Sequence, residues 1–333
     1  MQKLILVVAP AEKTDSIIAV AQGAEAHHVV TGTESNEHRR ALWMAVEPGQ
    51  RQSLMDKLQA VLGANNKDWQ MFVLPIEAMI PKPEVDENHD KEKKPAATTS
   101  REELYTAVES GIRIDRNFVI LVLLSTIVAA VGLMKDNVAA IIGAMVIAPL
   151  LGPNLALILG AALGDRDLIV RSIKANLAGL SMALILCFLL GTFITVDLTS
   201  HELISRTDIG VESVILALAS GAAAALSMLS GLSATLVGVM VAVALLPPAA
   251  TFGLLAGAGQ WQLAVGALTL LAVNVVCVNL SGQLVFWSRG VKPRSWRERK
   301  SAKRSFRTML FVWMFSLADL AAVIYFYNPI SIT

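Results

Sequence analysis

The chain has 333 residues, of which 54% are hydrophobic and 17% are charged, and its formal net charge is +1. A mean hydropathy of +0.57 excludes an ordinary soluble protein and predicts a polytopic α-helical membrane protein with a smaller soluble part. The two cysteines, Cys187 and Cys277, lie in separate apolar segments, and we interpret them as small core residues, not as a disulfide or metal pair.

Residues 1–80 have the pattern of a soluble α+β domain. Strand-like apolar runs and helical spacings follow one another in the order β-α-β-β-α-β, which is typical of a small ferredoxin-like domain. The first strand-like run, Lys3–Ala9, is too short for the core of a signal peptide, so we expect the N-terminus to stay in the cytoplasm. His27, His28 and His38 could form a metal cluster, but adjacent strand side chains point to opposite faces, and we predict no metal site.

Two short segments connect this domain to the membrane part. Residues 81–100 are rich in proline and charge, which predicts a disordered linker. Residues 101–117 carry Leu104, Val108 and Ile112 at helical spacing, and we expect an amphipathic juxtamembrane helix at the cytoplasmic surface.

Seven apolar segments are long enough to span a bilayer. We therefore expect the two ends of the chain on opposite sides of the membrane. The predicted spans are Phe118–Met134, Asn137–Leu163, Leu168–Val196, Ser213–Leu229, Ser233–Ala256, Gln262–Trp287 and Thr308–Tyr327.

The basic residues orient these spans. Most of them fall in segments expected inside the cell, above all in the basic loop 288–307, whereas Lys135 and Arg206 are the basic residues of the segments expected outside. This asymmetry predicts a multi-pass protein of the cytoplasmic (inner) membrane with its N-terminus inside and its C-terminus outside. The run 289–307 could be a nucleic-acid patch, but we expect it to contact anionic lipid and predict no nucleic-acid partner.

The membrane part contains an internal repeat, in which residues 118–196 correspond to residues 213–287. With an offset of 95 positions, Val119–Gly164 aligns with Val214–Gly259 without a gap, and 17 positions are identical. Each copy contains three spans, so the second copy must enter the membrane upside down relative to the first. Inverted repeats of this kind occur mainly in transporters and channels.

Prolines interrupt the second span of both copies. The first segment contains Pro149, Gly152, Pro153 and Asn154, and the second contains Pro247 and Pro248. Paired interruptions in two inverted halves indicate a substrate site or pore, while two packing kinks remain the alternative.

Further polar residues of the spans are candidates for function or for helix packing. Asn176, Asn274 and Asn279 in the third spans could bind substrate or join helices, and Asp319 could couple transport to a cation or form an ordinary hydrogen bond. The turn with Lys135, Asp136 and Asn137 could cap a helix or line a pore mouth. Stripes of small residues favour helix contacts within or between subunits, so we expect a homo-oligomer.

The segment from Lys135 to Asp165, KDNVAAIIGAMVIAPLLGPNLALILGAALGD, resembles the signature of a bacterial and archaeal membrane family known as domain of unknown function 389. The resemblance covers roughly residues 115–290. It implies a multi-span membrane protein, often with a small N-terminal domain, and it supplies no activity or mapped site.

Two functions fit these patterns. The first is a transporter or channel for a small solute or ion, with a regulatory or assembly domain in the cytosol. The second is a non-conducting scaffold or sensor whose soluble domain binds a ligand or partner. The membrane part has no nucleophile–base pair, phosphate loop or metal-ligand spacing, so we expect neither an enzyme nor a cofactor.

Overall fold

The structure, a computed structural model, describes residues 3–24, 26–46, 48–63, 68–76, 100–230, 234–291 and 296–327. The chain divides into two compact units, Met1–Arg101 and Glu102–Thr333. The predicted linker 81–100 lies outside the described residues except for Ser100.

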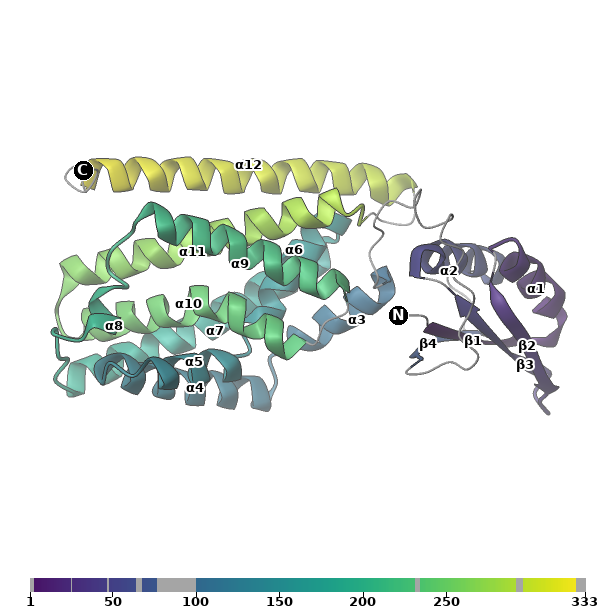
Figure 1. The fold of residues 1–333 in the computed structure, drawn as a ribbon, viewed down its shortest axis with the longest axis horizontal. Helices are drawn as coiled ribbons and strands as arrows, with labels where there is room; N and C mark the ends of the chain where they lie inside the picture. Colours follow the sequence, from purple (N-terminus) through teal and green to yellow (C-terminus); the bar gives the residue numbers. More distant parts are fainter. Residues whose placement is uncertain are drawn as a thin grey trace, which may run out of the picture. The chain divides into compact units, whose positions relative to one another are not determined.

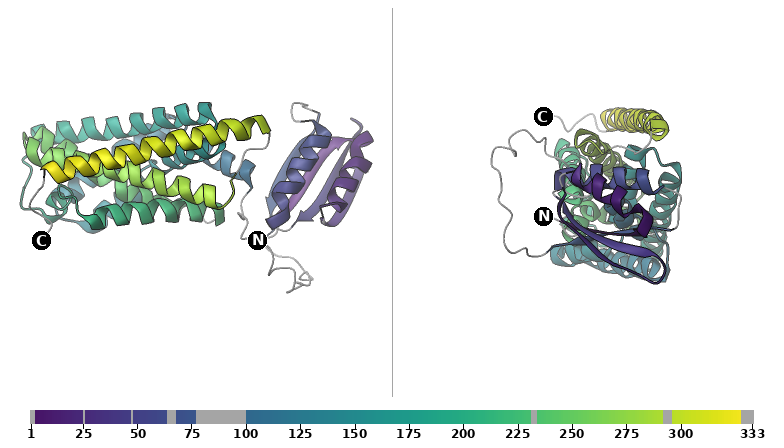
Figure 2. Two further views of the ribbon diagram at one scale, coloured as in Figure 1. Left: turned by 90° about the horizontal axis from the view of Figure 1, so that it is seen from above. Right: turned by 90° about the vertical axis from the view of Figure 1, so that its right-hand side faces the viewer.

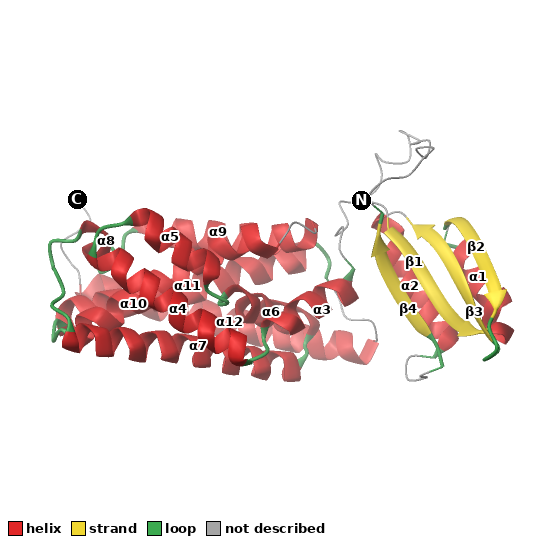
Figure 3. Cartoon of the chain, turned by 90° about the horizontal axis from the view of Figure 1, so that it is seen from below, coloured by secondary structure: helices red, strands yellow, loops and turns green. Residues whose placement is uncertain are grey.

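The N-terminal unit contains a four-stranded antiparallel sheet with two helices on one face (Figure 3). The strands lie in the order β2-β3-β1-β4, and the elements follow the predicted order β-α-β-β-α-β. The elements are β1 (Lys3–Pro10), α1 (Thr14–Gln22), β2 (His27–Glu34), β3 (Arg39–Val46), α2 (Pro48–Leu62) and β4 (Gln70–Pro75).

Alternation along β1 sets the core of this unit. Ile5, Val7 and Ala9 are fully buried and belong to one apolar cluster with Ile17 of α1 and Leu54 of α2. The alternate β1 side chains are only partly buried, because they face the side of the sheet opposite these helices.

The second unit is helical, and its long helices run side by side along a common axis (Figure 1). Helix α12 lies along the outside of this bundle (Figure 2). The helices are α3 (Arg101–Gly111), α4 (Arg116–Met134), α5 (Val138–Ile147), α6 (Leu151–Leu163), α7 (Arg166–Phe193), α8 (His201–Ile204), α9 (Val211–Ser230), α10 (Ala234–Gly257), α11 (Trp261–Ser288) and α12 (Trp296–Tyr327).

Among the described residues, four helices are long and apolar enough to cross a bilayer: α4, α7, α9 and α11. Helices α5 and α6 together form a fifth candidate, which bends by 54° at the break between them. The segments predicted as the fifth and seventh spans form α10 and α12. Several long apolar helices indicate a multi-pass membrane protein.

Contacts at the two ends of the bundle fix the direction of α7 and α11. At one end, called the α3 end, the Tyr105 hydroxyl of α3 lies 3.2 Å from the carboxylate of Asp165, which caps α7. At the other, called the α8 end, Gly266 near the start of α11 lies against the backbone of Thr207, which follows α8. The two helices therefore begin at opposite ends. They have the same length, 28 residues, and their first residues, Arg166 and Trp261, are 95 positions apart.

Helix packing relates the same two helices to the proline segments. Helix α7 packs against α10, which contains Pro247 and Pro248, and α11 packs against α6, which contains Pro153. Thus α7, which follows the first proline segment, contacts the helix with the second, and α11, which follows the second, contacts the helix with the first.

Two helix boundaries differ from the prediction. The sequence predicts a basic loop over 288–307, but α12 begins at Trp296. Lysine and arginine have high helix propensity, so a basic, water-exposed segment can also be helical. The sequence predicts one helix over 101–117, but α3 ends at Gly111 and α4 begins at Arg116. Asp115 enforces the restart by accepting a hydrogen bond from the Phe118 N–H (2.7 Å).

Candidate site at the proline segments

The first proline segment separates α5 from α6. Ala148 ends α5 in an extended conformation (φ −64°, ψ 123°), as expected for a residue that precedes a proline. Pro149 has no N–H, so the carbonyl of Met145 loses its normal helical donor. The chain resumes as a helix at Leu151 after a 54° change of direction. The predicted break is confirmed here.

The second proline segment does not break its helix. The sequence predicts a break at Pro247 and Pro248, but α10 continues through both residues. Pro248 cannot donate to the carbonyl of Ala244, four residues earlier. The side-chain amide of Asn274 on α11 donates to that carbonyl at 2.7 Å and replaces the missing donor. This bond satisfies the carbonyl that Pro248 leaves without a helical donor.

Three asparagines join the first proline segment to α7 and α11. The Asn154 amide donates to the carbonyl of Leu150 (2.9 Å) and to the side-chain oxygen of Asn176 (3.0 Å). Asn279 donates to the carbonyl of Val275 (2.8 Å) and, more weakly, to the side-chain oxygen of Asn154 (3.4 Å). Asn154 and Asn279 are only 2% and 1% exposed. These bonds join α6 to α7 and α11, which favours the packing alternative, although the side-chain oxygen of Asn279 is buried without a partner among the described residues.

Helix α3 closes one side of the first proline segment. A Cβ atom at Gly152 would lie 2.7 Å from the carbonyl oxygen of Gly111, so the two backbones touch where α6 begins. Leu104 and Val108, from the predicted apolar stripe of α3, are buried in the protein. The glycine pair explains why α3 can approach this closely.

A polar network holds the outer part of α3. Arg171 of α7 pairs with Glu109 of α3 at 3.1 Å and with Asp167 at 2.8 Å, and Tyr105 bonds to Asp165. Burial raises the pKa of Tyr105, and the neighbouring Asp165 carboxylate raises it further. The phenol therefore remains a hydrogen-bond donor throughout the physiological pH range.

A cavity of about 170 Å³ lies beside the second proline segment. Five of its ten lining side chains are polar, and it is called the polar cavity below. It extends from the α8 end, where Ser205 and Arg206 line it, to Asn274 near the middle of α11. Arg206 is paired with Glu202 at 2.7 Å, so the cavity carries no uncompensated charge from this arginine. A space of this size has room for about five water molecules or one small solute. The remaining lining residues are Ser213, Leu216, Ala217, Ser220, Ala244, Pro248 and Leu270.

The turn between α4 and α5 has a capping geometry at the α8 end. Asn137 accepts a hydrogen bond from the Ala140 N–H at 3.0 Å and caps α5, while Lys135 is the C-cap residue that follows α4. Asp136 has a left-handed backbone (φ 54°) and accepts bonds from the Ser200 hydroxyl (3.1 Å) and the Glu202 N–H (2.7 Å). The turn thus fastens α8 to the bundle.

The structure separates Asp319 from both proline segments. It lies on α12 and lines a different cavity. Among the described residues, no group of three or more histidine, cysteine, aspartate or glutamate side chains could hold a metal ion.

Comparison with known proteins relates this arrangement to one family. The family described as Domain of unknown function (DUF389) matches residues 145–280, a stretch that contains both proline segments. The uncharacterized protein MJ0678 of Methanocaldococcus jannaschii is 36% identical over 263 residues, which cover 79% of this chain and 80% of that protein. The chain belongs to the DUF389 family. No solved structure matches it.

Sequence reasoning missed much of the polar cavity of this DUF389 protein. Ser205, Arg206 and Ser213 lie in or beside the loop between α8 and α9, where no periodic pattern guides a prediction. Ser220 had a signal, because it is identical to Ser125 in the repeat alignment. Of the predicted candidates, the structure brings Asn274 and Pro248 together at the cavity, and Asn154 and Asn176 together in the amide cluster.

Proposed function

We propose that this protein is a membrane transporter or channel for a small solute or ion. The observation that carries the proposal is the polar cavity, because it connects the α8 end of the bundle with a proline segment and a buried amide. Substrate sites of transporters lie near the middle of the bilayer, and this cavity reaches Asn274 at the middle of α11.

The proposed architecture has seven spans in two inverted three-span repeats, followed by α12. The equal lengths of α7 and α11, their 95-residue offset and their opposite directions support this proposal. Glycines at matching positions support it further, since Gly164 and Gly259 both adopt positive φ, 71° and 76°, where their helices end.

The proposed location is the cytoplasmic membrane, with the α3 end inside and the α8 end outside. The basic residues near the α3 end, including Arg113, Arg116 and Arg171, support this orientation. The N-terminal domain, proposed to be ferredoxin-like, would then regulate or assemble the transporter in the cytosol, and the basic run 289–307 would contact anionic lipid. We propose a homo-oligomer of unspecified size.

The cavity favours a small and weakly charged substrate. Its hydroxyls and the Asn274 amide can donate and accept hydrogen bonds, and Arg206 is neutralised by Glu202. Such groups suit a neutral polar solute or a small anion.

The experiment is flux into liposomes that contain the purified full-length protein. Sodium, potassium, proton and chloride fluxes are followed with ion-sensitive dyes, and uptake of glycerol and urea by light scattering. Replacing Ser220 with Val narrows the cavity and should lower the flux, whereas Ser181→Val, on the exposed surface of α7, should leave it unchanged. Absence of flux for every solute, also after removal of residues 1–80, would refute the proposal.

A non-conducting scaffold or sensor is the alternative. The backbone contact between Gly111 and Gly152 and the hydrogen bonds of Asn154 to Leu150 and Asn176 favour it, because they use polar groups of the first proline segment for packing. This alternative predicts that the Ser220→Val variant and the wild type behave identically in every flux assay.

A further inference from the structure

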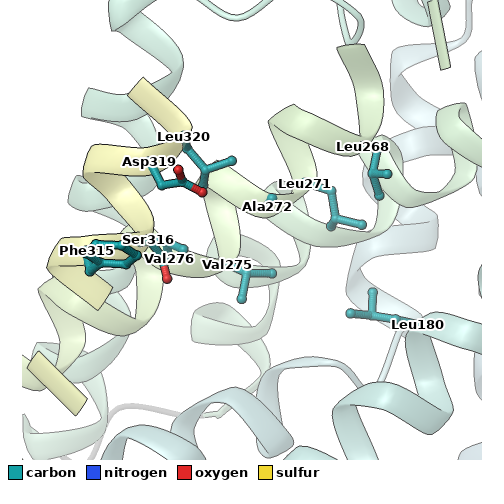
Figure 4. Close-up of a pocket in the computed structure, with 10 residues that line it drawn as sticks. All are labelled: Leu180, Leu268, Leu271, Ala272, Val275, Val276, Phe315, Ser316, Asp319 and Leu320. Carbon is teal, nitrogen blue, oxygen red and sulfur yellow. The ribbon is translucent and has the colours of Figure 1, made fainter. Parts of the chain in front are cut away.

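A second cavity, of about 490 Å³, lies between α7, α11 and α12 (Figure 4). Eight of its ten lining side chains are apolar, and its two polar side chains, Ser316 and Asp319, both come from α12. The cavity is open to the outside of the bundle, where Asp319 and Phe315 are exposed. The other lining residues are Leu180, Leu268, Leu271, Ala272, Val275, Val276, Phe315 and Leu320.

The cavity lies at mid-depth of the bundle. Leu180 and Val275 are each the fifteenth residue of a 28-residue helix, and they occupy equivalent positions 95 residues apart. Asp319 lies about 17 Å along α12 from Thr308, where the basic run ends, which is about half of a 30 Å hydrocarbon core.

Among the described residues, none provides Asp319 with a counter-ion. The structure gives it no hydrogen bond or ion pair with any residue of the described ranges, and its carboxylate points from α12 toward α11 (Figure 4). A carboxylate at mid-depth of a bilayer is costly unless it finds a partner. A cation bound in the cavity would supply one.

The lining selects the kind of cation. A calcium or magnesium ion needs about six oxygen ligands, and these walls offer one carboxylate and one hydroxyl. An organic cation with delocalised charge needs one counter-ion and apolar or aromatic contacts, which Leu180, Leu271 and Phe315 provide. The volume is within the usual range for pockets that hold drug-sized molecules, about 300–1,000 Å³.

We propose that the cavity between α7, α11 and α12 binds a lipophilic organic cation, with Asp319 as its counter-ion. This site is separate from the polar cavity at Pro248, and binding to it requires no transport activity.

The test is binding of rhodamine 6G to the full-length protein in detergent, followed by fluorescence polarisation. We expect saturable binding that tetraphenylphosphonium competes away and that neutral tetraphenylmethane does not. Asp319→Asn should raise the dissociation constant about tenfold, equivalent to about 1.4 kcal/mol, and Asp319→Glu should largely preserve it. Asp208→Asn, an acidic residue between α8 and α9 that does not line the cavity, is the matched control and should bind like the wild type.

Several results would overturn the proposal. These are absence of saturable binding by the wild type, equal affinity of Asp319→Asn and wild type in preparations with the same gel-filtration profile, and equal competition by the neutral compound. A Ser316→Cys variant tests another occupant, because Cys187 and Cys277 are buried. Disulfide-linked dimers of that variant, together with no dye binding by the wild type, would assign the groove to a second copy of the chain.

Discussion

Replacing Asn274 with Ala should destabilise the bundle through a single backbone carbonyl. The Asn274 amide donates at 2.7 Å to the carbonyl of Ala244, which has no helical donor because residue 248 is proline. Ala244 is 5% exposed but lines the polar cavity, so a water molecule there can replace part of the lost bond. An unsatisfied buried carbonyl costs about 1–3 kcal/mol, and interhelical bonds in membrane proteins average nearer 0.6 kcal/mol, so we expect a loss of about 1 kcal/mol.

A second substitution isolates this carbonyl from other effects of removing the amide. Pro248→Ala restores an N–H at the position that can bond to Ala244, so Asn274→Ala should cost less in that background than in the wild type. The two changes should therefore couple by about 1 kcal/mol in a double-mutant cycle.

Reversible unfolding in mixed micelles of dodecyl sulfate and dodecyl maltoside, monitored by tryptophan fluorescence, measures the four free energies. Asn279→Ala in the same helix is the control, because its amide bonds to the carbonyl of Val275, a contact unrelated to Pro248. Strict additivity of Pro248→Ala and Asn274→Ala, or equal coupling for Asn279→Ala, would refute the assigned role of Asn274.

Three further predictions follow from local geometry. Gly152→Ala should lower the thermal unfolding midpoint, because the new Cβ would lie 2.7 Å from a backbone oxygen of α3. Gly143→Ala is the control, and it should leave the midpoint unchanged or raise it, because nothing lies within 4 Å of its Cβ. Equal midpoints for the two variants would contradict the backbone contact. The raised pKa of Tyr105 means that its stabilising contribution is complete below the unfolded value of 10.0 and is lost as pH rises through the higher folded value. Tyr105→Phe should therefore remove part of the alkaline decline in stability seen on pH titration of the wild type, and identical pH profiles would count against this. Ile5→Ala should destabilise the N-terminal unit by about 2–4 kcal/mol, and Leu6→Ala, on the opposite face of β1, by clearly less, as judged by chemical denaturation of the full-length chain.

Helices and strands that show a regular spacing of apolar residues were predictable from the sequence. The strands and helices of residues 3–75 follow from alternation and helical spacing, and the long apolar helices follow from uninterrupted apolar length. The repeat was readable because Gly164 and Gly259 keep one register, and both prove to end a helix with positive φ.

Contacts between distant residues were not predictable in the same way. The expected break at Pro247 and Pro248 was wrong, because α10 continues through both residues. Asn274, 26 residues beyond Pro248, bonds to one of the two carbonyls that these prolines leave without a donor. The partners of Asn154 were open for the same reason: an amide in a span needs a bond, but its sequence position does not reveal which neighbour provides it. The cavity walls depend on how α8, α9 and α11 meet, and no local pattern encodes that meeting.

Helices α7 and α11 have the same length and correspond residue by residue in the repeat, yet they differ in the number of charged residues near their first turns. Arg166, Arg171 and Lys174 of α7 correspond, at the 95-residue offset, to Trp261, Gly266 and Thr269 of α11. During biosynthesis, the insertion machinery retains the basic end of a nascent helix on the side where the chain is made. Apolar length then decides how far each helix extends, while a few basic residues decide which way it is inserted. Exchanging those residues between the two helices should therefore alter the route of membrane insertion more than the final length of either helix.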